Sequence, residues 1–340
     1  MPSLTGRRLE RAKASRQFRG GRFQNTSNRR PELGASALPI FRDLIFGGRK
    51  RVPHRPLPVE NPLPLWKTPS VSGLRVTWFG HSTLLLEIDG GTILTDPVFG
   101  QRASPFFFTG RTRFHPPPAK ISELPKLDAV LLSHDHYDHL NTPSIRELAR
   151  MRVPFVTSLG VGVRLEKLGV DASLITELDW WETHDIGSLK ITAAPAQHFS
   201  GRGVSDRNVT LWSSWALKGT KHNVFFSGDT GLTDELSEIG RRLGPFDLVM
   251  LEIGASHPAW ADIHLGPANA LRAFDMLGGG RLLPIHWSTF DLALHAWDEP
   301  AETLLTLAGD GAARLITPPL GRPVEPVDVE GPTPWWRSVR

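Results

Sequence analysis

The chain has 340 residues, 40% of them hydrophobic, which is enough for one large domain or two ordinary ones with ample core. The absence of cysteine excludes disulfides and thiolate metal ligands. The formal net charge of +4 hides an asymmetry: residues 1–55 carry 14 basic and 3 acidic side chains, and the rest of the chain carries 25 basic and 32 acidic ones. The basic character therefore belongs to the N-terminal segment.

Residues 1–70 are expected to form a basic, proline-rich N-terminal arm and linker. The arm lacks the apolar stretch of a secretory signal, and no later run is long enough to span a membrane, so we expect a cytoplasmic protein. The segment 38–51 mixes apolar and basic residues, which suits peripheral contact with an anionic membrane surface. In that case, removing residues 1–55 would weaken vesicle binding and leave the activity of the remaining domain near normal. An organellar targeting segment, or a tail whose apolar residues pack on the domain, would have the same composition.

Six prolines between Pro53 and Pro69 predict an extended strap into the main domain. We place that domain at residues 71–330, followed by a C-terminal tail at 331–340. Three strand-like runs open the domain, with a hairpin turn at 89–91 between the last two; they lie at 74–79, 83–88 and 92–95. The loop beyond them contains Phe106, Phe107 and Phe108, which we expect to form a pocket wall, although core or lid packing would need the same residues.

The most informative stretch is 134–139, which places three histidines and two aspartates in six positions. It follows a buried strand at 128–132 and precedes a helix, for which we predict Thr142 as the N-cap and Pro143 as the first residue. Imidazole and carboxylate are ligands that suit zinc, iron or manganese. A polar surface loop rich in histidine is the alternative, but further ligand types occur at matching places in the chain.

Three other apolar runs end in a residue that can bind a metal. The runs 189–197, 223–228 and 281–285 lead to His198, Asp229 and His286. If these runs are strands of one sheet system, their ends converge at a common edge, where ligand sites of strand-and-helix folds tend to lie. Any one of these residues alone would more often be an ordinary polar group, but the joint pattern predicts a site for two ions. The candidate ligands are His134, His136, Asp138, His139, His198, Asp229 and His286.

The motif Ser-His-Asp-His-Tyr-Asp-His-Leu at 133–140, with the stretches 227–231 and 284–287, resembles the metallo-β-lactamase superfamily. Within it, the stretches 78–83 and 177–182 are similar to the N-acyl-phosphatidylethanolamine-hydrolysing phospholipase D group and its bacterial relatives. The resemblance runs from about residue 75 to about residue 300. It implies an α/β protein with the αββα sandwich of the superfamily and the metals at one edge of the paired sheets.

The resemblance also implies a role for each site residue. His134, His136 and His198 would hold one zinc ion, Asp138, His139 and His286 the other, with Asp229 bridging; iron or manganese are alternatives. Asp96 would support a metal-binding histidine from behind, and His81 would either line the site or bond beneath the metal loop. Asp138 and His264 are the candidate catalytic residues. His264 would stabilise charge or protonate the leaving oxygen, although a histidine just before a helix could equally be structural.

The implied activity is that of a two-metal phosphodiesterase of the phospholipase D type. It would cleave N-acyl-phosphatidylethanolamine or a related phospholipid with a hydroxide shared by the ions. A lactonase or another ester or phosphodiester hydrolase is the alternative, because the same site serves many substrates. Nucleic-acid binding through the basic arm is a third possible function. We do not expect it, because the rest of the chain carries more acidic than basic side chains. A binding protein with a structural metal fits poorly, because seven ligands for two ions normally leave an open position.

Overall fold

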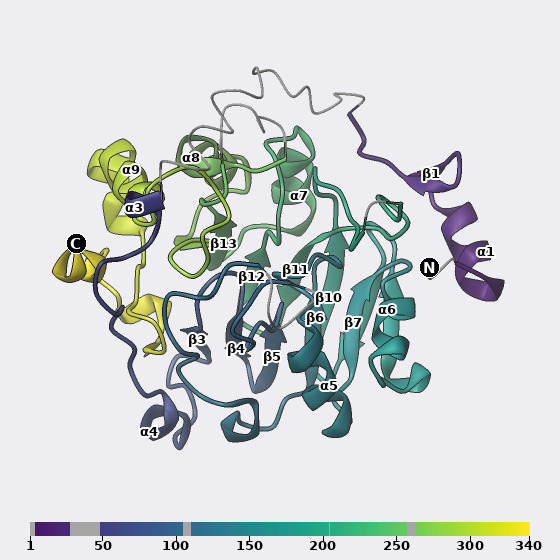
Figure 1. Cartoon of the computed structure of the whole chain (residues 1–340), viewed down its shortest axis with the longest axis horizontal. Helices are drawn as coiled ribbons and strands as arrows, with labels where there is room; N and C mark the ends of the chain where they lie inside the picture. The colour runs from purple at the N-terminus through teal and green to yellow at the C-terminus, as the bar shows by residue number, and fades with distance from the viewer. Residues whose placement is uncertain (1–3, 28–47, 105–109, 204, 257–262) are drawn as a thin grey trace.

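The computed structural model describes residues 4–27, 48–104, 110–203, 205–256 and 263–340 (Figure 1). A seven-stranded sheet runs in the order β15 (Pro323–Val324), β3 (Leu74–Trp78), β4 (Leu84–Ile88), β5 (Gly91–Thr95), β6 (Ala129–Leu132), β7 (Phe155–Ser158) and β8 (Ile175–Leu178). A six-stranded sheet runs in the order β14 (Arg281–Ile285), β13 (Leu248–Glu252), β12 (Asn223–Phe226), β11 (Ser214–Lys218), β10 (Leu189–Ala194) and β9 (Thr183–Ile186). The two sheets share one core, and helices cover their outer faces. This arrangement confirms the predicted αββα sandwich.

The side chains of β4 show how the strands divide the core. Leu84, Leu86 and Ile88 pack into the core that the two sheets share, whereas Leu85 packs into a second core on the outer face. The division follows from the two-residue period of a strand, which sends successive side chains to opposite faces. Both faces are buried, so the strand is apolar at four of its five positions.

Helices close both outer cores. α5 (Thr142–Arg150) and α6 (Gly162–Lys167) pack on the seven-stranded sheet through Ile145, Leu148 and Leu165. On the other side α7 (Glu235–Leu243), α8 (Gly266–Met276) and α9 (Glu299–Ala308) pack against the six-stranded sheet. Two shorter helices precede β3: α3 (Gly48–Arg51) lies just before the proline-rich strap, and α4 (Leu63–Trp66) lies within it.

The start of α5 differs from the expectation. The N-cap is Asn141 rather than Thr142, which is the first helical residue. Asn141 has extended backbone angles, and its Oδ1 accepts hydrogen bonds from the backbone N–H of Ser144 (3.3 Å) and from the Ser144 hydroxyl (2.7 Å). An asparagine side chain thus satisfies an N–H that would otherwise lack a partner, and Pro143 follows within the first turn.

A hairpin turn joins β4 to β5, as the sequence predicts, but it has two residues rather than three, because Gly91 pairs with Ile88 and already belongs to β5. Asp89 and Gly90 have φ angles of 48° and 90°, and both are positive, as a type I′ turn requires. The Asp89 carboxylate accepts hydrogen bonds from the backbone N–H groups of Lys221 (2.7 Å) and His222 (2.9 Å), and it contacts His222 Nδ1 at 2.8 Å. These two residues lie in the turn between β11 and β12, so Asp89 ties one sheet to the other.

The segments outside the predicted main domain also pack on it. In the proline-rich strap, Leu57 is buried in the shared core, and the N–H of Glu60 donates to the carbonyl of Leu320 (2.8 Å). In the C-terminal segment, Trp335 and Trp336 are buried in the same core. The arm forms α1 (Gly6–Ala14) and a small hairpin of β1 (Phe18–Arg19) and β2 (Arg22–Phe23), beside α6 in Figure 1. The domain boundaries at residues 70 and 330 stay a prediction.

Within the described ranges, no helix is long and apolar enough to cross a membrane. Most of the segment proposed for membrane contact, up to residue 47, lies outside the described residues. The same is true of Phe106, Phe107 and Phe108, so their expected part in a pocket wall stays a prediction.

Candidate metal centre

The seven candidate ligands come together at the ends of four strands. The loop after β6 carries His134, His136, Asp138 and His139, and His198, Asp229 and His286 follow β10, β12 and β14. β6 belongs to the seven-stranded sheet and the other three strands to the six-stranded one. The centre therefore lies where the ends of both sheets meet. A Cβ at Gly228 would lie 2.5 Å from that of Ser133, so a glycine before Asp229 lets the two sheets approach here.

One group of ligands consists of His134, His136, His198 and Asp229. His136 Nδ1 lies 2.7 Å from His134 Nε2 and 3.3 Å from His198 Nε2. Asp229 Oδ2 lies 4.0 Å from His134 Nε2 and 3.7 Å from His198 Nε2. Ligands about 2.1 Å from a tetrahedral zinc ion are about 3.4 Å apart, so these atoms surround a space of the right size.

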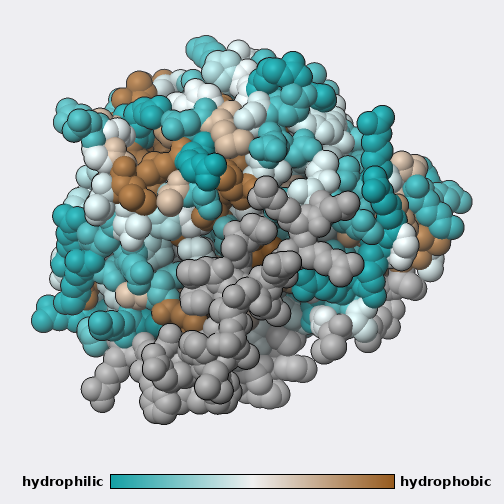
Figure 2. All heavy atoms as spheres, turned by 90° about the horizontal axis from the view of Figure 1, so that it is seen from above, coloured by the Kyte–Doolittle hydropathy of each residue, from teal (hydrophilic) through white to brown (hydrophobic). Residues whose placement is uncertain are grey.

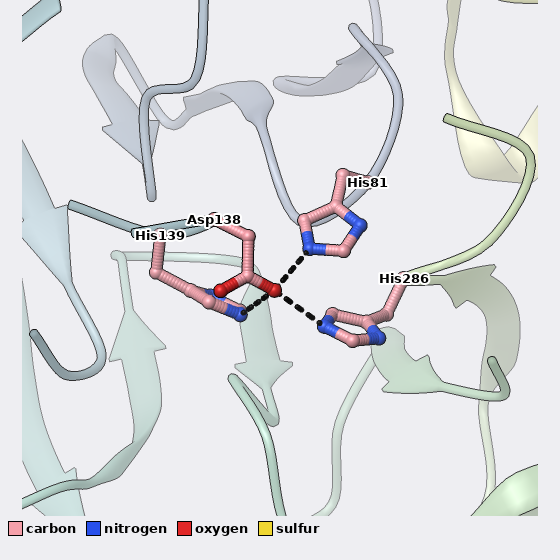
Figure 3. A group of neighbouring side chains, drawn as sticks. All are labelled: His81, Asp138, His139 and His286. Carbon is pink, nitrogen blue, oxygen red and sulfur yellow. Dashed lines mark hydrogen bonds and ion pairs between the residues drawn. The ribbon is translucent and has the colours of Figure 1, made fainter. Parts of the chain in front are cut away.

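A second group surrounds Asp138, whose carboxylate faces three imidazoles in Figure 3. Asp138 Oδ2 lies 3.5 Å from His139 Nε2, 3.5 Å from His286 Nε2 and 2.9 Å from His81 Nε2. Asp229 also reaches this group, because its Oδ2 is 3.2 Å from His139 Nε2 and its Oδ1 is 3.2 Å from His286 Nε2. One carboxylate thus belongs to both groups, as expected for a bridging ligand.

The donor atoms of these groups fit divalent ions. His139 Nε2, His286 Nε2 and Asp229 Oδ1 are fully buried and form no hydrogen bond within the described part of the chain. Buried polar atoms without partners are costly, at about 1–3 kcal/mol each, so several of them facing one point fit a site that binds a cation.

The charge states of His134, Asp229 and Asp138 suit the same role. Burial, followed by the neighbouring His139 and His136, lowers the pKa of His134 well below 6.5, so the ring is neutral and can bind an ion. Burial alone would raise the pKa of Asp229, but His139 and His286 outweigh it and hold the pKa well below 3.8. Asp138 behaves in the same way, with His139 as the main opposing partner. Burial would lower the pKa of His139 and His286, but the carboxylates of Asp229 and Asp138 outweigh it and raise the pKa of both above 6.5, so a bound ion would take the place of a proton on these two rings. Neutral imidazoles and ionised carboxylates are the forms that bind metal.

Asp96 lies behind the second group. Its Oδ2 accepts hydrogen bonds from His139 Nδ1 (2.6 Å) and from the hydroxyl of Ser133 (2.6 Å), and its Oδ1 accepts one from the backbone N–H of Ser133 (2.8 Å). With its Nδ1 proton held in this way, His139 turns Nε2 toward the centre. The Nδ1 atom of His198 is held similarly, 2.9 Å from the carbonyl oxygen of Ile263.

His81 lines the site, and its ring centroid is 3.9 Å from that of His286. Burial, and then the neighbouring His286, lowers the pKa of His81 to about 3, so it is neutral and can donate from Nε2 to Asp138. The φ angles of His81, Asp96 and His286 are 51°, 32° and 65°. Such angles cost about 1–3 kcal/mol each and are typical of residues that a functional site holds in place. Here the N–H of His286 donates to the carbonyl of His81 (3.0 Å).

Residues 91–287 match the protein family described as "Beta-lactamase superfamily domain". The chain belongs to this superfamily. An uncharacterized protein of Mycobacterium tuberculosis (strain ATCC 25618 / H37Rv) is 47% identical over 289 residues, 84% of this chain and 77% of the relative. The N-acyl-phosphatidylethanolamine-hydrolyzing phospholipase D 1 of Caenorhabditis elegans is 37% identical over 255 residues, 72% of this chain and 71% of the relative.

Solved structures have the same fold. The isothiocyanate hydrolase from Delia radicum gut bacteria superposes with a TM-score of 0.60 over 74% of this chain and 98% of its own, at 19% identity. At that identity the likeness shows the fold alone. Superfamily membership, named relatives and the two ligand groups together identify the protein as a metal-dependent hydrolase of the metallo-β-lactamase superfamily.

The sequence-based prediction did not include Glu252, a buried residue beside the metal centre. Glu252 ends β13, and its Oε2 lies 2.6 Å from His264 Nδ1, while its Oε1 accepts a hydrogen bond from the N–H of Thr230 (2.8 Å). Burial raises the pKa of Glu252, although His264 opposes this, and Glu252 in turn raises the pKa of His264 against the effect of burial. The structure thus brings His264 to the metal centre, with its ring centroid 5.1 Å from that of His198. The rule that identified His198 and Asp229, a ligand type at a strand end, would have found Glu252 too.

Proposed function

We propose that the protein is a zinc-dependent phosphodiesterase of the phospholipase D type, acting on N-acyl-phosphatidylethanolamine or a related phospholipid. The observation that carries this proposal is the position of Asp229, within 3.2 Å of both His139 and His286 and within 3.7 Å of His198. A carboxylate between two ligand groups suits a pair of ions, which is the arrangement used for displacement at phosphorus. The 37% identical relative from Caenorhabditis elegans, named for this activity, supports the choice of substrate.

The chain would supply positioning and a proton. When bound, the two ions would lower the pKa of a water molecule and offset the charge of the phosphoryl oxygens. Asp229 would hold the ions together, and His264 would donate a proton to the leaving oxygen. Glu252 holds His264 through Nδ1, which leaves Nε2 for the substrate, and the His264 side chain keeps 11% of its surface exposed.

A cavity beside His264 suits part of the substrate. It has a volume of about 390 Å³ and lies between the first turns of α8 and α9; its lining includes His264, Leu265, Pro267, Asn269, His295 and Thr303. A cavity of this size takes a head group and a few methylenes rather than two acyl chains. Figure 2 shows apolar atoms gathered on the left of the face seen from above, the side on which α8 and α9 lie in Figure 1. Apolar surface on that side would suit an acyl chain.

Contact with a membrane surface through the arm is part of the proposal. Arg7, Lys13, Arg16 and Arg19 are exposed, and each cation near an anionic surface contributes up to about 1 kcal/mol. Replacing all four by glutamine should weaken binding to anionic vesicles and flatten its salt dependence. Unchanged vesicle binding would remove the arm from the membrane interaction.

The decisive experiment is mass spectrometry of the products from N-acyl-phosphatidylethanolamine vesicles, incubated with zinc-loaded protein in ¹⁸O-water. Phosphatidic acid that carries the label on its phosphate, with release of N-acylethanolamine, is the expected result. Absence of product would exclude this substrate and direct the search to lactones and smaller phosphodiesters. Elemental analysis of protein purified without added metal should find two zinc ions per chain; iron or manganese instead would correct the choice of metal.

A further inference from the structure

The described part of the arm, residues 4–27, is docked on the domain through an apolar cluster of its own. Leu4, Ala12 and Phe23 are buried, and they pack with domain residues from four separate segments: Leu159, Trp180, Ala196, Leu211 and Trp212. Phe23 is fully buried, and its N–H donates to the carbonyl of Asn208 (2.8 Å). This part of the arm therefore has a fixed place on the domain.

Ionic contacts hold the same segment. Arg8 binds Glu166 at 2.9 Å and Glu177 at 2.6 Å, and Arg11 forms an ion pair with Glu182. These arginines are part of the excess positive charge of the arm. They meet acidic residues on α6, on β8 and just before β9, so a share of that charge serves the contact with the domain.

The last described residues of the arm, near residue 27, lie beside the candidate metal ligand His198. Asn25 Nδ2 donates to the carbonyl of His198 (2.9 Å), and Asn25 Oδ1 accepts from the N–H of His198 (3.1 Å). One amide side chain thus pairs with both backbone groups of His198. The same Oδ1 accepts from Trp212 Nε1 (3.1 Å), and Ser27 Oγ donates to Gln197 Oε1 (2.6 Å).

A second path leads from the arm to the first ligand group. Arg22 donates to the carbonyl oxygens of Ser205 (3.1 Å) and Arg207. The Arg207 guanidinium lies 4.3 Å from the ring centroid of Phe199, and that ring lies 4.6 Å from the ring centroid of His136. The arm therefore lies close to two of the three histidines in this group, His198 through Asn25 and His136 through Arg207 and Phe199.

We propose that the N-terminal arm positions the metal ligand His198, with Asn25 as the positioning residue. His198 is 1% exposed, so its backbone N–H and carbonyl would lack water if Asn25 were removed. The backbone would then shift to find other partners and carry the imidazole away from its three companions. The inference rests on the metal centre of the proposed function, but it does not depend on the substrate.

The test compares Asn25→Ala with Gln24→Ala in the full-length protein loaded with zinc. Gln24 is the neighbouring arm residue; it is exposed, and among the described residues its side chain hydrogen-bonds to the carbonyl of Arg19 in the hairpin (3.3 Å) and to no metal ligand. Zinc affinity is measured by competition with a chelator, and the visible spectrum of the cobalt-substituted protein reports the coordination of each ion. In Asn25→Ala, one of the two ions should bind about 10–100-fold more weakly and its cobalt spectrum should change, while Gln24→Ala behaves as the wild type. Equal affinities in the two variants would overturn the proposal.

Two further variants guard against a simple loss of stability. Val170→Ala creates a gap in the core between the seven-stranded sheet and its covering helices, which contains none of the arm residues 4–27. Val170→Ala should lower the melting temperature about as much as Asn25→Ala does. If it also weakened metal binding as much as Asn25→Ala, the cause would be a general loss of stability, and the proposal would fail. If Asn25→Ala does not fold, Asn25→Asp keeps the acceptor for Trp212 and removes the donor to His198; wild-type affinity in that variant would also overturn the proposal. None of these readouts uses a lipid, so an incorrect substrate leaves them intact, whereas a wild-type protein that binds fewer than two ions would contradict the metal centre itself.

Discussion

Oε2 of the fully buried Glu252 lies 2.6 Å from Nδ1 of the partly buried His264 beside the metal centre. If His264 protonates the leaving oxygen, His264→Gln should lower kcat by about 10²–10⁴-fold without loss of metal. Glu252→Gln removes the charge that holds the ring and should lower kcat by about 10–100-fold. Steady-state kinetics with metal analysis checks both, and His54→Gln, at an exposed histidine, is the control. A variant at position 264 with normal kcat would make this histidine structural.

Asp229→Ala should remove the link between the two ligand groups. We expect the metal content to fall and hydrolysis to decrease by more than about 100-fold, because the Asp229 carboxylate lies within 3.7 Å of His198 in one group and within 3.2 Å of His139 and His286 in the other. Metal analysis and product assays measure the two effects. The exposed Asp310→Ala should match the wild type in both. Full activity in Asp229→Ala would remove the bridging assignment.

Asp96→Asn tests the support of His139. The amide replaces one of the oxygens that accept from His139 Nδ1 and Ser133, so the Nδ1 proton of His139 loses its fixed acceptor. We expect about 10–100-fold weaker binding of one ion. In the cobalt-substituted protein the affected ion should differ from the one that Asn25→Ala affects, because the two residues support different ligand groups. The same spectral change in both variants would contradict the assignment of ligands to groups.

The Asp89 contact between the sheets predicts a pH dependence of stability. Burial would raise the pKa of Asp89, but hydrogen bonds from Lys221 and His222 lower it below 3.8 overall. The folded state therefore favours the ionised form, so the stabilisation is complete above pH 3.8 and is lost as the pH falls through the lowered value. Asp89→Asn should reduce the free energy of unfolding by about 1–2 kcal/mol at pH 7. Urea unfolding of both metal-free proteins should show this difference unchanged at pH 5 and smaller below pH 3.8; a difference that stays constant at low pH would point to another cause.

Much of the fold and the centre follows from local patterns. The sequence predicts the strand runs, the hairpin turn at Asp89 and the loop 134–139. Each depends on a local property: the pattern of apolar residues, the turn residues, or the concentration of histidine and aspartate. Even the meeting of His198, Asp229 and His286 could be predicted, since each ends an apolar run. The predicted N-cap of α5, Thr142, was wrong by one residue. Asn141 and Thr142 are both good caps, and only the backbone angles decide between them.

The arm makes contacts that sequence patterns do not reveal. Its arginines predict an anionic partner, and the structure gives acidic partners to Arg8 and Arg11 within the same chain. For this reason we no longer expect that removing residues 1–55 would leave hydrolysis near normal. Asn25 carries no signal of its role, because its partner His198 lies 173 positions away. Glu252, in contrast, could have been predicted, because it ends the apolar run 248–251 just as Asp229 ends the run 223–228.

The distance along the chain between Asn25 and His198 also bears on how the protein is made. Asn25 leaves the ribosome 173 residues before its partner, so the arm must wait while most of the seven-stranded sheet and the first two strands of the six-stranded sheet are synthesised. Contacts between such distant residues form late, after nearby strands have paired. The segment around Asn25 is thus made long before it can reach its place. A newly made chain would offer a metal ion a complete and fixed set of ligands only at the end of folding, which delays metal capture until the domain is finished.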